Sequence, residues 1–500
     1  MTTKKVVFCA LIACLLAAVF LTPRHSSAAP PTYTLTTAVV GSGAVDPAGG
    51  TYNKNAVVTV MAIPDPGWTF DHWDGDLSGT ENPTTIRMSS DKHVIAVFVE
   101  EGVPTPTPTP TPEPHGKEVA GYFAQWAIYR RNYLVKNVVT SGSAEKLTVI
   151  NYAFAGIDDD LKCMSLDPFA DYNKAFDESE SVDGVADPTS GTVLRGNFNQ
   201  LRKLKIMYPQ IRVLISIGGW SDSYNFSDAA LPENRAAFVS SCVDMFINGN
   251  FAPGIVDPTV FDGIDVDWEY PAMPGMEGNV YRPEDTQNFT ALLAEFRSQL
   301  DAIDPDLLLT IAAPAGEPYY SKIELDLIHP YLDWINLMTY DYHGGWEMTT
   351  NHHAPLYSSP ADPTAGGSTN DTVLAYLDAG ISAGKLHLGV PFYGRGWAGV
   401  PDVNNGLYQT AGRIPRGKYE KGVDDFKELK NYGYPGFWDP VAQAYWIYNG
   451  NEFWSYDNAD SVTNKMGYVV GQNLGGVMFW ELSGDDAAGT LITAIDNGLR

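Results

Sequence analysis

The sequence has little positive charge. Its 500 residues include 32 Lys and Arg against 60 Asp and Glu, which gives a formal net charge of −28 and a pI of about 4.5. A surface this acidic repels nucleic acid and anionic membranes, because binding to either depends on basic patches. A neutral ligand does not feel this field. We therefore expect no nucleic-acid partner.

Long apolar runs are also rare. One run covers residues 6–21, follows Lys4 and Lys5, and precedes small residues at 26–29. This pattern predicts a signal peptide over residues 1–28. The run is short for a membrane span, and no later segment resembles one. Residues 11–14 resemble a lipoprotein cleavage box, but the apolar run continues past them. We expect a secreted, extracellular protein with no membrane association once the signal is removed.

Cysteine is also scarce. Of the four cysteines in the chain, two lie in the predicted signal and leave Cys163 and Cys242. An exported protein could pair these two, but their spacing does not show that they meet. Two free, buried thiols is the interpretation that we favour slightly.

Alternating Pro and Thr at 104–112 predicts a linker over residues 101–116, because such a run forms an extended polyproline II rod. Before it, residues 31–100 alternate short β-like segments with Gly- and Pro-rich turns, which predicts an all-β module. Its segment 67–79 resembles the bacterial repeat modules of exported proteins. We favour core packing of Trp68 and Trp73 over stacking on a polysaccharide.

Residues 117–500 alternate apolar β-like segments with amphipathic helical ones, such as 235–247, 284–300 and 372–383. Eight such units predict an α/β fold, a (β/α)8 TIM barrel. A long Tyr-, Gly- and Asn-rich stretch at about 397–461 predicts an α+β insertion after strand seven. The eight predicted strands are 119–123, 147–154, 213–217, 261–267, 307–312, 334–340, 386–391 and 476–480.

The fourth predicted strand carries the densest chemistry. Its sequence FDGIDVDWEY alternates acids with large apolar residues, so Asp265, Asp267 and Glu269 share one face with period two. Asp262 lies on the other register, and we interpret it as structural. Glu269 is then highest, at the C-terminal mouth where such barrels carry active sites. Neighbouring carboxylates raise one another's pKa, which suits acid–base work. The alternatives are a metal site, against which no His is near in sequence, or a costly structural network.

Residues 262–269 match the DGxDxDWE signature, and the chain resembles the family-18 glycoside hydrolases, the chitinases. SIGGW at 216–220, MTYDY at 338–342, PFYGRGW at 391–397 and GVMFWE at 476–481 are similar to the family's other strand-end motifs. The five motifs follow the family order over nearly all of 117–500. The likeness is strongest to bacterial chitinases with an insertion after strand seven.

The resemblance implies a retaining mechanism in which the sugar's own acetamido group is the nucleophile. Glu269 would be the general acid, and Asp267 would hold the acetamido N–H. Asp265 would exchange a proton with Asp267. Tyr340 would bind the acetamido oxygen, and Asp341 would position the distorted sugar.

Aromatic and polar residues at strand ends gain substrate-binding roles from the same resemblance. Trp480 would be the floor of the −1 subsite, and Trp220 and Trp346 would be product-side platforms. Trp126 would be a platform on the non-reducing side. The remaining expected substrate-binding residues are Tyr122, Phe154, Tyr270, Met338, Tyr393, Arg395, Tyr419 and Glu420. We interpret His343, His352 and His353 as loop residues, and expect cis peptides at Ala153-Phe154 and Trp480-Glu481.

The function that the sequence predicts is therefore a secreted endo-acting chitinase. We expect no cofactor and no metal, chitin or chitooligosaccharides as partner, and a monomer. The alternatives are an endo-β-N-acetylglucosaminidase acting on N-glycans and a chitin-binding lectin on the same fold. The presence of Glu269 disfavours the lectin, because such lectins usually lack this acid.

Overall fold

The computed structural model describes residues 31–77, 79–100, 116–364 and 366–500. The chain divides into two compact units, Met1–Pro110 and Thr111–Arg500. The predicted signal peptide and nearly all of the predicted linker lie outside the described residues. Within the described part, no helix is long and apolar enough to cross a membrane.

The N-terminal unit is all-β, as predicted. Trp73 is buried at the centre of its core, and Trp68 packs against that core from the side. Alternate residues of the fourth strand, such as Val58 and Val60, point inward while their neighbours are exposed. The strands form sheets of order β3-β1-β7-β5 and β2-β4-β6. They are β1 (Thr32–Val40), β2 (Gly43–Asp46), β3 (Gly50–Asn53), β4 (Val57–Pro64), β5 (Trp68–Gly75), β6 (Thr84–Arg87) and β7 (Lys92–Glu100).

The C-terminal unit is a closed parallel barrel, which confirms the predicted TIM-barrel fold. Its strands pair in the order β8-β9-β11-β14-β15-β16-β17-β23, and β23 pairs with β8 to close the ring. All eight predicted strands are present, with ends shifted by a few residues. They are β8 (Glu118–Ala124), β9 (Val149–Ile157), β11 (Arg212–Gly218), β14 (Gly263–Asp267), β15 (Leu308–Pro314), β16 (Trp334–Met338), β17 (Leu386–Pro391) and β23 (Gly476–Trp480).

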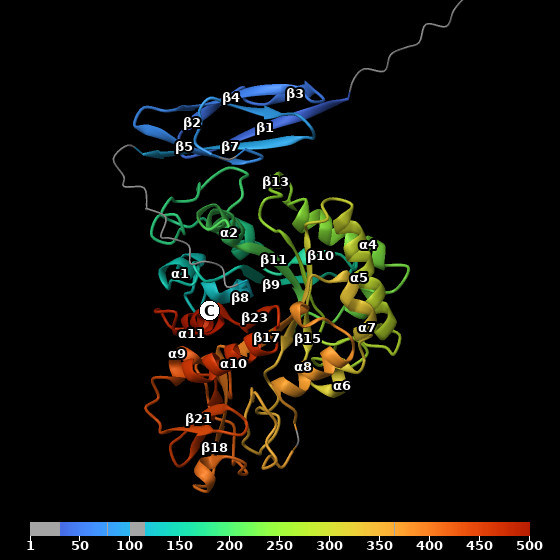
Figure 1. Cartoon of the computed structure of the whole chain (residues 1–500), viewed down its shortest axis with the longest axis vertical. Coiled ribbons are helices and arrows are strands. Elements are labelled where there is room, and N and C mark those ends of the chain that lie inside the picture. The colour runs from blue at the N-terminus through green and yellow to red at the C-terminus, as the bar shows by residue number, and fades with distance from the viewer. Residues whose placement is uncertain (1–30, 78, 101–115, 365) are drawn as a thin grey trace, which may run out of the picture. The chain divides into compact units, whose positions relative to one another are not determined.

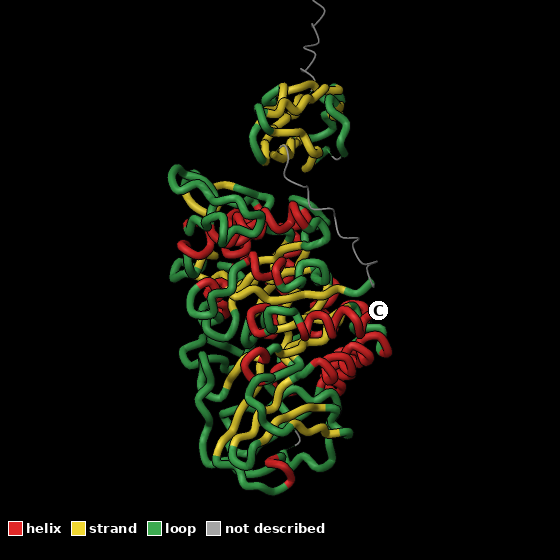
Figure 2. Tube along the Cα trace, turned by 90° about the vertical axis from the view of Figure 1, so that its left-hand side faces the viewer, coloured by secondary structure: helices red, strands yellow, loops and turns green. Residues whose placement is uncertain are grey.

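Helices surround the barrel strands, and the tube in Figure 2 shows them outside the strands of this unit. Helix α5 (Asp285–Asp301) buries Phe289, Leu292, Leu293 and Phe296, a spacing that places one apolar face on the barrel. The others include α1 (Val135–Thr140), α2 (Gly196–Met207), α4 (Arg235–Cys242), α7 (Leu325–Ile328), α8 (Thr369–Asp378), α10 (Ala459–Gly471) and α11 (Thr490–Leu499).

One predicted helical stretch changes type along its length, and the bounds of another were wrong. Helix α4 ends at Cys242 and passes into a π-helical turn over Val243–Ile247. Helix α8 begins three residues before the predicted start, because the Ser368 side chain accepts a hydrogen bond from the backbone of Asp371 and caps it. It ends near Gly380, whose φ of 91° suits the left-handed position that follows a helix.

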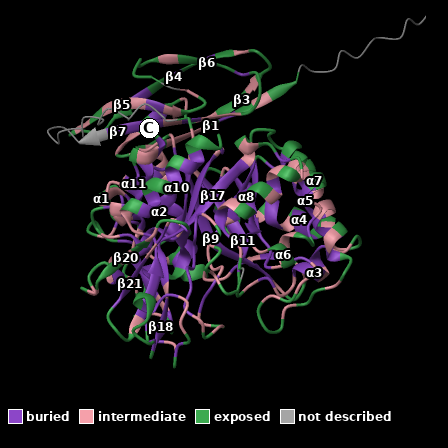
Figure 3. Cartoon of the chain, turned by 60° about the horizontal axis from the view of Figure 1, so that its bottom comes forward, coloured by how far each residue is buried: buried purple, intermediate pink, exposed green. Residues whose placement is uncertain are grey.

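A five-stranded antiparallel sheet follows the seventh barrel strand, in the region of the predicted insertion. Its order is β19-β18-β22-β21-β20, and it is seen at the end of the C-terminal unit in Figure 1. The strands are β18 (Tyr393–Ala398), β19 (Val423–Asp425), β20 (Gly436–Asp439), β21 (Ala444–Tyr448) and β22 (Glu452–Tyr456). The burial colours of Figure 3 show β18 and the barrel strands largely buried.

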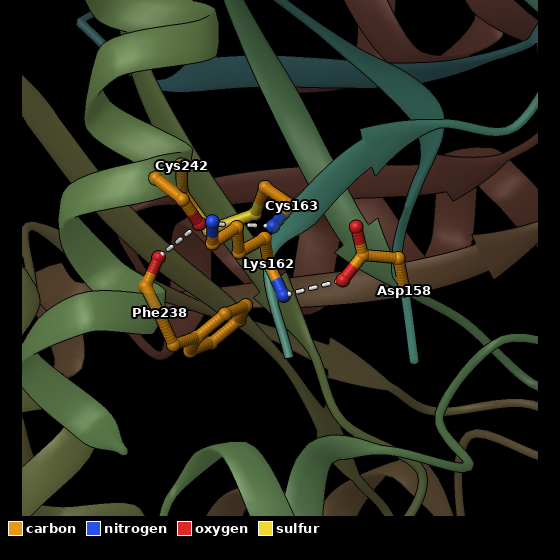
Figure 4. Close-up of a disulfide and its surroundings, with 6 residues drawn as sticks. Asp158, Lys162, Cys163, Phe238 and Cys242 are labelled. Atoms are coloured by element: carbon orange, nitrogen blue, oxygen red, sulfur yellow. Dashed lines mark hydrogen bonds between the residues drawn. A yellow bond between two sulfur atoms is a disulfide. The ribbon is translucent and has the colours of Figure 1, made fainter. Parts of the chain in front are cut away.

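Cys163 and Cys242 form a disulfide, so the prediction of two free thiols was wrong. Cys163 begins β10 (Cys163–Ser165), which folds back antiparallel on β9, and Cys242 ends α4. The backbone N–H of Cys163 donates to the Ser241 hydroxyl, which brings the two segments together. Figure 4 shows the disulfide between Cys163 and Cys242. The sequence separation of 79 residues gave no sign of this approach.

Candidate active site

The acid column, formed by Asp265, Asp267 and Glu269, rises through the barrel interior along β14 and the residues just after it. The residues that alternate with these acids, Ile264, Val266 and Trp268, pack in the core under the helices, as the alternation predicts. Asp265 is fully buried at the level of the neighbouring strands. Its carboxylate accepts hydrogen bonds from side chains of five other barrel strands: Tyr122 (2.7 Å), Asn151 (3.3 Å), Ser216 (2.9 Å), Thr310 (2.6 Å) and Asn336 (3.3 Å).

These donors limit the effect of burial on Asp265. Burial raises its pKa, and the hydroxyl and amide donors, which favour the ionised form, oppose that shift only in part. Asp267 has no such donors, and its buried Oδ1 has no hydrogen-bond partner among the described residues. Burial, together with the charges of Glu269 and Asp265, raises the pKa of Asp267 well above its ordinary value. The lower acid is therefore the better anion, and Asp267 holds a proton.

Glu269 lies at the mouth of the barrel just beyond the end of β14. Burial raises its pKa to about 7, a hydrogen bond from Tyr270 lowers it, and the charge of Asp341 raises it. Its backbone N–H donates to the Ser223 hydroxyl at 3.0 Å, which fixes the chain leaving the strand. A carboxyl group with this pKa is protonated in a large fraction of molecules at neutral pH, as a general acid requires.

Gly218 explains why the loop after β11 can pack closely against Asp267. A Cβ on Gly218 would lie 2.5 Å from the carbonyl oxygen of Asp267, and its φ of 108° is a left-handed conformation that favours glycine. The following glycine donates its N–H to the same carbonyl oxygen at 2.7 Å. The backbone of the acid column is therefore anchored from the neighbouring strand.

Asp341 follows β16 and faces the same cavity. Arg395 on β18 donates from Nε to its Oδ1 at 2.8 Å and from a terminal nitrogen to its other oxygen, a two-pronged ion pair. Burial alone would raise the pKa of Asp341, but Arg395 and His353 outweigh it and hold the pKa below the ordinary range. Asp341 is therefore a fixed anion, whereas Tyr340 beside it is a neutral phenol with a raised pKa.

A cleft of about 1140 Å³ lies over these groups. Asp265 lies beneath it and does not line it. All the other residues that the sequence predicted for the site do: Tyr122, Trp126, Phe154, Trp220, Asp267, Glu269, Tyr270, Met338, Tyr340, Asp341, Trp346, Tyr393, Arg395, Tyr419, Glu420 and Trp480.

The floor and walls of the cleft are aromatic. Trp480 stacks on Phe154 with ring centroids 5.6 Å apart and also packs against Tyr122. In contrast, the predicted platforms Trp126, Trp220 and Trp346 are 42%, 51% and 62% exposed. All three line the same cleft, and large exposed apolar side chains that gather at one place are typical of a binding surface. The expected cis peptides at Ala153-Phe154 and Trp480-Glu481 are both present, together with one at Glu269-Tyr270.

Sequence reasoning missed several groups of the cleft. Arg131 donates to Asp425 on β19 at 2.6 Å, lies 3.4 Å from Glu481, and is stacked under the ring of Tyr419 at 4.2 Å. It thereby joins the barrel to the wall that the insertion contributes. Asp222 also lines the cleft beside Trp220. A lone Arg in a loop carries no pattern by which it could have been found.

The interpretation of three histidines as loop residues was incomplete, because all three are buried. His343 pairs with Glu347 at 2.6 Å, and its carboxylate neighbours raise its pKa to about 9 although burial opposes this. His352 contacts Asp439 at 3.2 Å. His353 lies behind Asp341. Among the described residues, no group of three His, Cys, Asp or Glu is placed to hold a metal ion.

A closed (β/α)8 barrel with an acid column at its mouth and an aromatic cleft is the architecture of a glycoside hydrolase. The family described as glycosyl hydrolases family 18 matches residues 118–485, and the chain belongs to this family. Residues 33–102 match the divergent InlB B-repeat domain.

The chain is similar to several named proteins. Chitinase 63 of Streptomyces plicatus is 42% identical over 391 residues, which cover 77% of this chain and 61% of that protein. The solved catalytic domain of psychrophilic chitinase B from Arthrobacter TAD20 has a TM-score of 0.74 at 38% identity, covering 77% of this chain and 96% of that one. A family-18 N-acetylglucosaminidase from Paenibacillus barengoltzii has a TM-score of 0.61 at 31% identity, covering 76% and 99%. The chain spans 56–61% of the length of the first three curated relatives it matches.

Proposed function

We propose that this protein is a secreted chitinase that hydrolyses β-1,4-linked N-acetylglucosamine with retention of configuration. The observation that carries the proposal is the graded acid column under an aromatic cleft. Its middle acid, Asp267, has a buried oxygen without a hydrogen-bond partner among the described residues, and its top acid, Glu269, has a pKa of about 7.

In the proposed reaction, the proton of Glu269 passes to the glycosidic oxygen as the bond from that oxygen to the anomeric carbon breaks. The acetamido oxygen of the same sugar attacks the anomeric carbon and forms an oxazolinium ion. Glu269, now ionised, takes a proton from water. The resulting hydroxide adds to the anomeric carbon and opens the oxazolinium ring. Two displacements restore the original configuration.

The acetamido group needs a partner at each end. Its N–H would donate to the free Oδ1 of Asp267, and Asp265 would exchange a proton with Asp267 during the reaction. Its oxygen would accept from the hydroxyl of Tyr340, which the raised pKa keeps protonated. The positive charge that develops on the ring would be stabilised by the anionic column.

A polymer is favoured over a single sugar by the size of the cleft, about 1140 Å³, and by its lining. The three exposed tryptophans, Trp126, Trp220 and Trp346, line it together with the floor residue Trp480, and apolar sugar faces stack on such rings. This favours cleavage within a chain over removal of terminal N-acetylglucosamine. A time-course of products from chitohexaose tests it, since internal cleavage releases dimers to tetramers first.

The decisive test is Glu269→Gln, which keeps the shape of the side chain and removes its proton. We expect kcat on chitotetraose to fall by about 10²–10⁴-fold, the usual contribution of a general acid. Binding of the oligosaccharide, followed by tryptophan fluorescence, should persist. The matched control is Glu277→Gln, an exposed acid in the following loop, which should retain full activity. Activity of Glu269→Gln within a few-fold of wild type would refute the assignment.

Three parallel measurements separate the alternatives. Release of glycan from a high-mannose glycoprotein without chitin cleavage would favour an endo-β-N-acetylglucosaminidase. Binding of chitin without turnover by the wild-type protein would favour a lectin. Proton NMR of fresh product should detect the β-anomer first, and the α-anomer would exclude retention.

Export and the domain bounds belong to the same proposal. We place a signal peptide at 1–28, the repeat module at 31–100, the linker at 101–116 and the catalytic barrel at 117–500, with an insertion at about 397–461. Mass spectrometry of protein recovered from the medium of an expressing host should show a chain that begins at residue 29 or 30. A full-length cell-retained product would contradict it.

A further inference from the structure

His353 is completely buried and joins three parts of the C-terminal unit. Its backbone oxygen accepts the N–H of Tyr342 at 3.1 Å, so the loop that leaves β16 doubles back on itself. Its own backbone N–H donates to the hydroxyl of Ser455 on β22 at 3.0 Å. The backbone of His353 is therefore fixed between the loop that follows β16 and the five-stranded antiparallel sheet, which we call the insertion sheet.

The two ring nitrogens face different elements. Nε2 lies 3.3 Å from the carbonyl oxygen of Tyr393 at the start of β18. Nδ1 lies 3.3 Å from the backbone nitrogen of Asp341 and 3.1 Å from its Oδ1. Because a carbonyl oxygen only accepts, Nε2 carries a proton.

The ring of His353 contacts Asp341 whether it is neutral or protonated. Burial lowers the pKa of His353 although the carboxylate of Asp341 raises it, so the ring is neutral at neutral pH. Nδ1 then accepts the backbone N–H of Asp341, and in the protonated ring it would donate to the carboxylate instead. The other charged groups around the ring are Arg395 on β18 and Asp457 after β22.

Asp341 needs such support. It is a non-glycine residue with a φ of 58°, a left-handed conformation that L-residues adopt only where their surroundings impose it. Arg395 holds the carboxylate of Asp341 but makes no contact with its backbone in the described hydrogen bonds. The backbone N–H of this residue meets Nδ1 of His353.

We infer that His353 is a positioning residue of the active site, which fixes the backbone of Asp341 and ties it to the strand that carries Arg395. This rests on the proposed function, in which Asp341 positions the distorted sugar. His353 does not line the cleft, so it would not contact the substrate. We expect it to affect kcat through the position of Asp341.

Two substitutions in the full chain test the inference with chitotetraose as substrate. His353→Leu removes both ring nitrogens at similar volume, and we expect kcat to fall about 10- to 100-fold, the effect of a lost hydrogen bond to a charged or fixed group. KM should stay within threefold. His353→Asn keeps an amide oxygen that can accept the N–H of Asp341, so we expect a loss of only about 3- to 10-fold.

The neighbouring residue supplies a matched control. His352 is also buried in the same loop but contacts Asp439 and does not line the cleft. His352→Leu and His352→Asn should cost similar thermal stability and leave kcat within about threefold of wild type. A His353→Leu enzyme with kcat equal to that of His352→Leu would overturn the inference.

A double-mutant cycle separates positioning from general loosening. In an Asp341→Asn background, both His353 substitutions should have no further effect on kcat, because they act through the same side chain. Equal losses in both backgrounds would overturn the inference. If His353→Leu does not fold, the cycle with His353→Asn decides alone. Failure of wild type to cleave chitotetraose would overturn the proposed function instead.

Discussion

The pH dependence of catalysis is the most direct consequence of the acid column. In the proposed mechanism Glu269 must be protonated to act as the general acid, and its pKa is about 7. We therefore expect kcat/KM to be constant below this pH and to fall tenfold per unit above it. An ordinary glutamate would instead lose its proton near pH 4.3, so activity at pH 6 already depends on the burial of this carboxyl group.

Tyr270 provides a way to shift the alkaline limb of the pH profile, where kcat/KM falls, in a known direction. Its hydroxyl forms a hydrogen bond with Glu269 that favours the ionised carboxylate and so lowers the pKa. Removing the hydroxyl in Tyr270→Phe should therefore raise the pKa of Glu269. A hydrogen bond to a charged group contributes about 1.5–3 kcal/mol, and 1.36 kcal/mol corresponds to one pKa unit. We predict that the alkaline limb moves upward by about one to two pH units.

The measurement is kcat/KM on a soluble chitooligosaccharide between pH 4 and 10 at constant ionic strength. Tyr319→Phe is the control, because its ring packs against Tyr270 with centroids 4.5 Å apart and it has no hydrogen bond with Glu269 among those described. Its limb should remain in place. A limb that stays fixed or moves to lower pH in Tyr270→Phe would refute the reasoning.

Three further predictions concern other parts of the fold. Replacing Cys163 and Cys242 by Ala opens a loop of 79 residues and should cost about 4.5 kcal/mol of unfolding free energy, measured by urea denaturation; an unchanged midpoint would contradict it. Arg395→Lys loses the two-pronged pair with Asp341 and should lower kcat about tenfold with little change in thermal stability. Trp346→Ala should slow hydrolysis of insoluble chitin several-fold but spare a short chromogenic substrate; equal losses on both would argue against a platform.

The sequence alone predicted the barrel well because its strands are buried on both faces. Apolar runs such as 213–217 and 386–391 permit few other structures between amphipathic helices, and β11 and β17 appear where expected. Helix ends were less accurate. The start of α8 depends on one hydroxyl, that of Ser368, and several other polar residues nearby could have served as the cap.

Contacts between distant segments could not be predicted in this way. Cys163 meets Cys242 only because a three-residue strand, β10, turns back on β9 and carries the thiol to the end of α4. His353 is buried only because the insertion sheet packs against its loop through Ser455. Both outcomes depend on tertiary packing that local residue patterns do not encode.

The order of charges in the acid column shows the same limit at the site itself. Alternation placed Asp265, Asp267 and Glu269 on one face and implied that some would share protons, but it could not say which acid holds a proton. Burial raises the pKa of all three acids, and the hydrogen-bond donors to each acid oppose that rise to different extents. Asp265 has five, Glu269 has the hydroxyl of Tyr270, and the buried Oδ1 of Asp267 has none in the described structure. The five donors to Asp265 each come from a different strand: Tyr122 on β8, Asn151 on β9, Ser216 on β11, Thr310 on β15 and Asn336 on β16. No motif of one strand shows that they converge on this carboxylate. Closure of the barrel brings them to one point, so the proton held at Asp267 is a property of the whole ring and not of the strand that carries the acids.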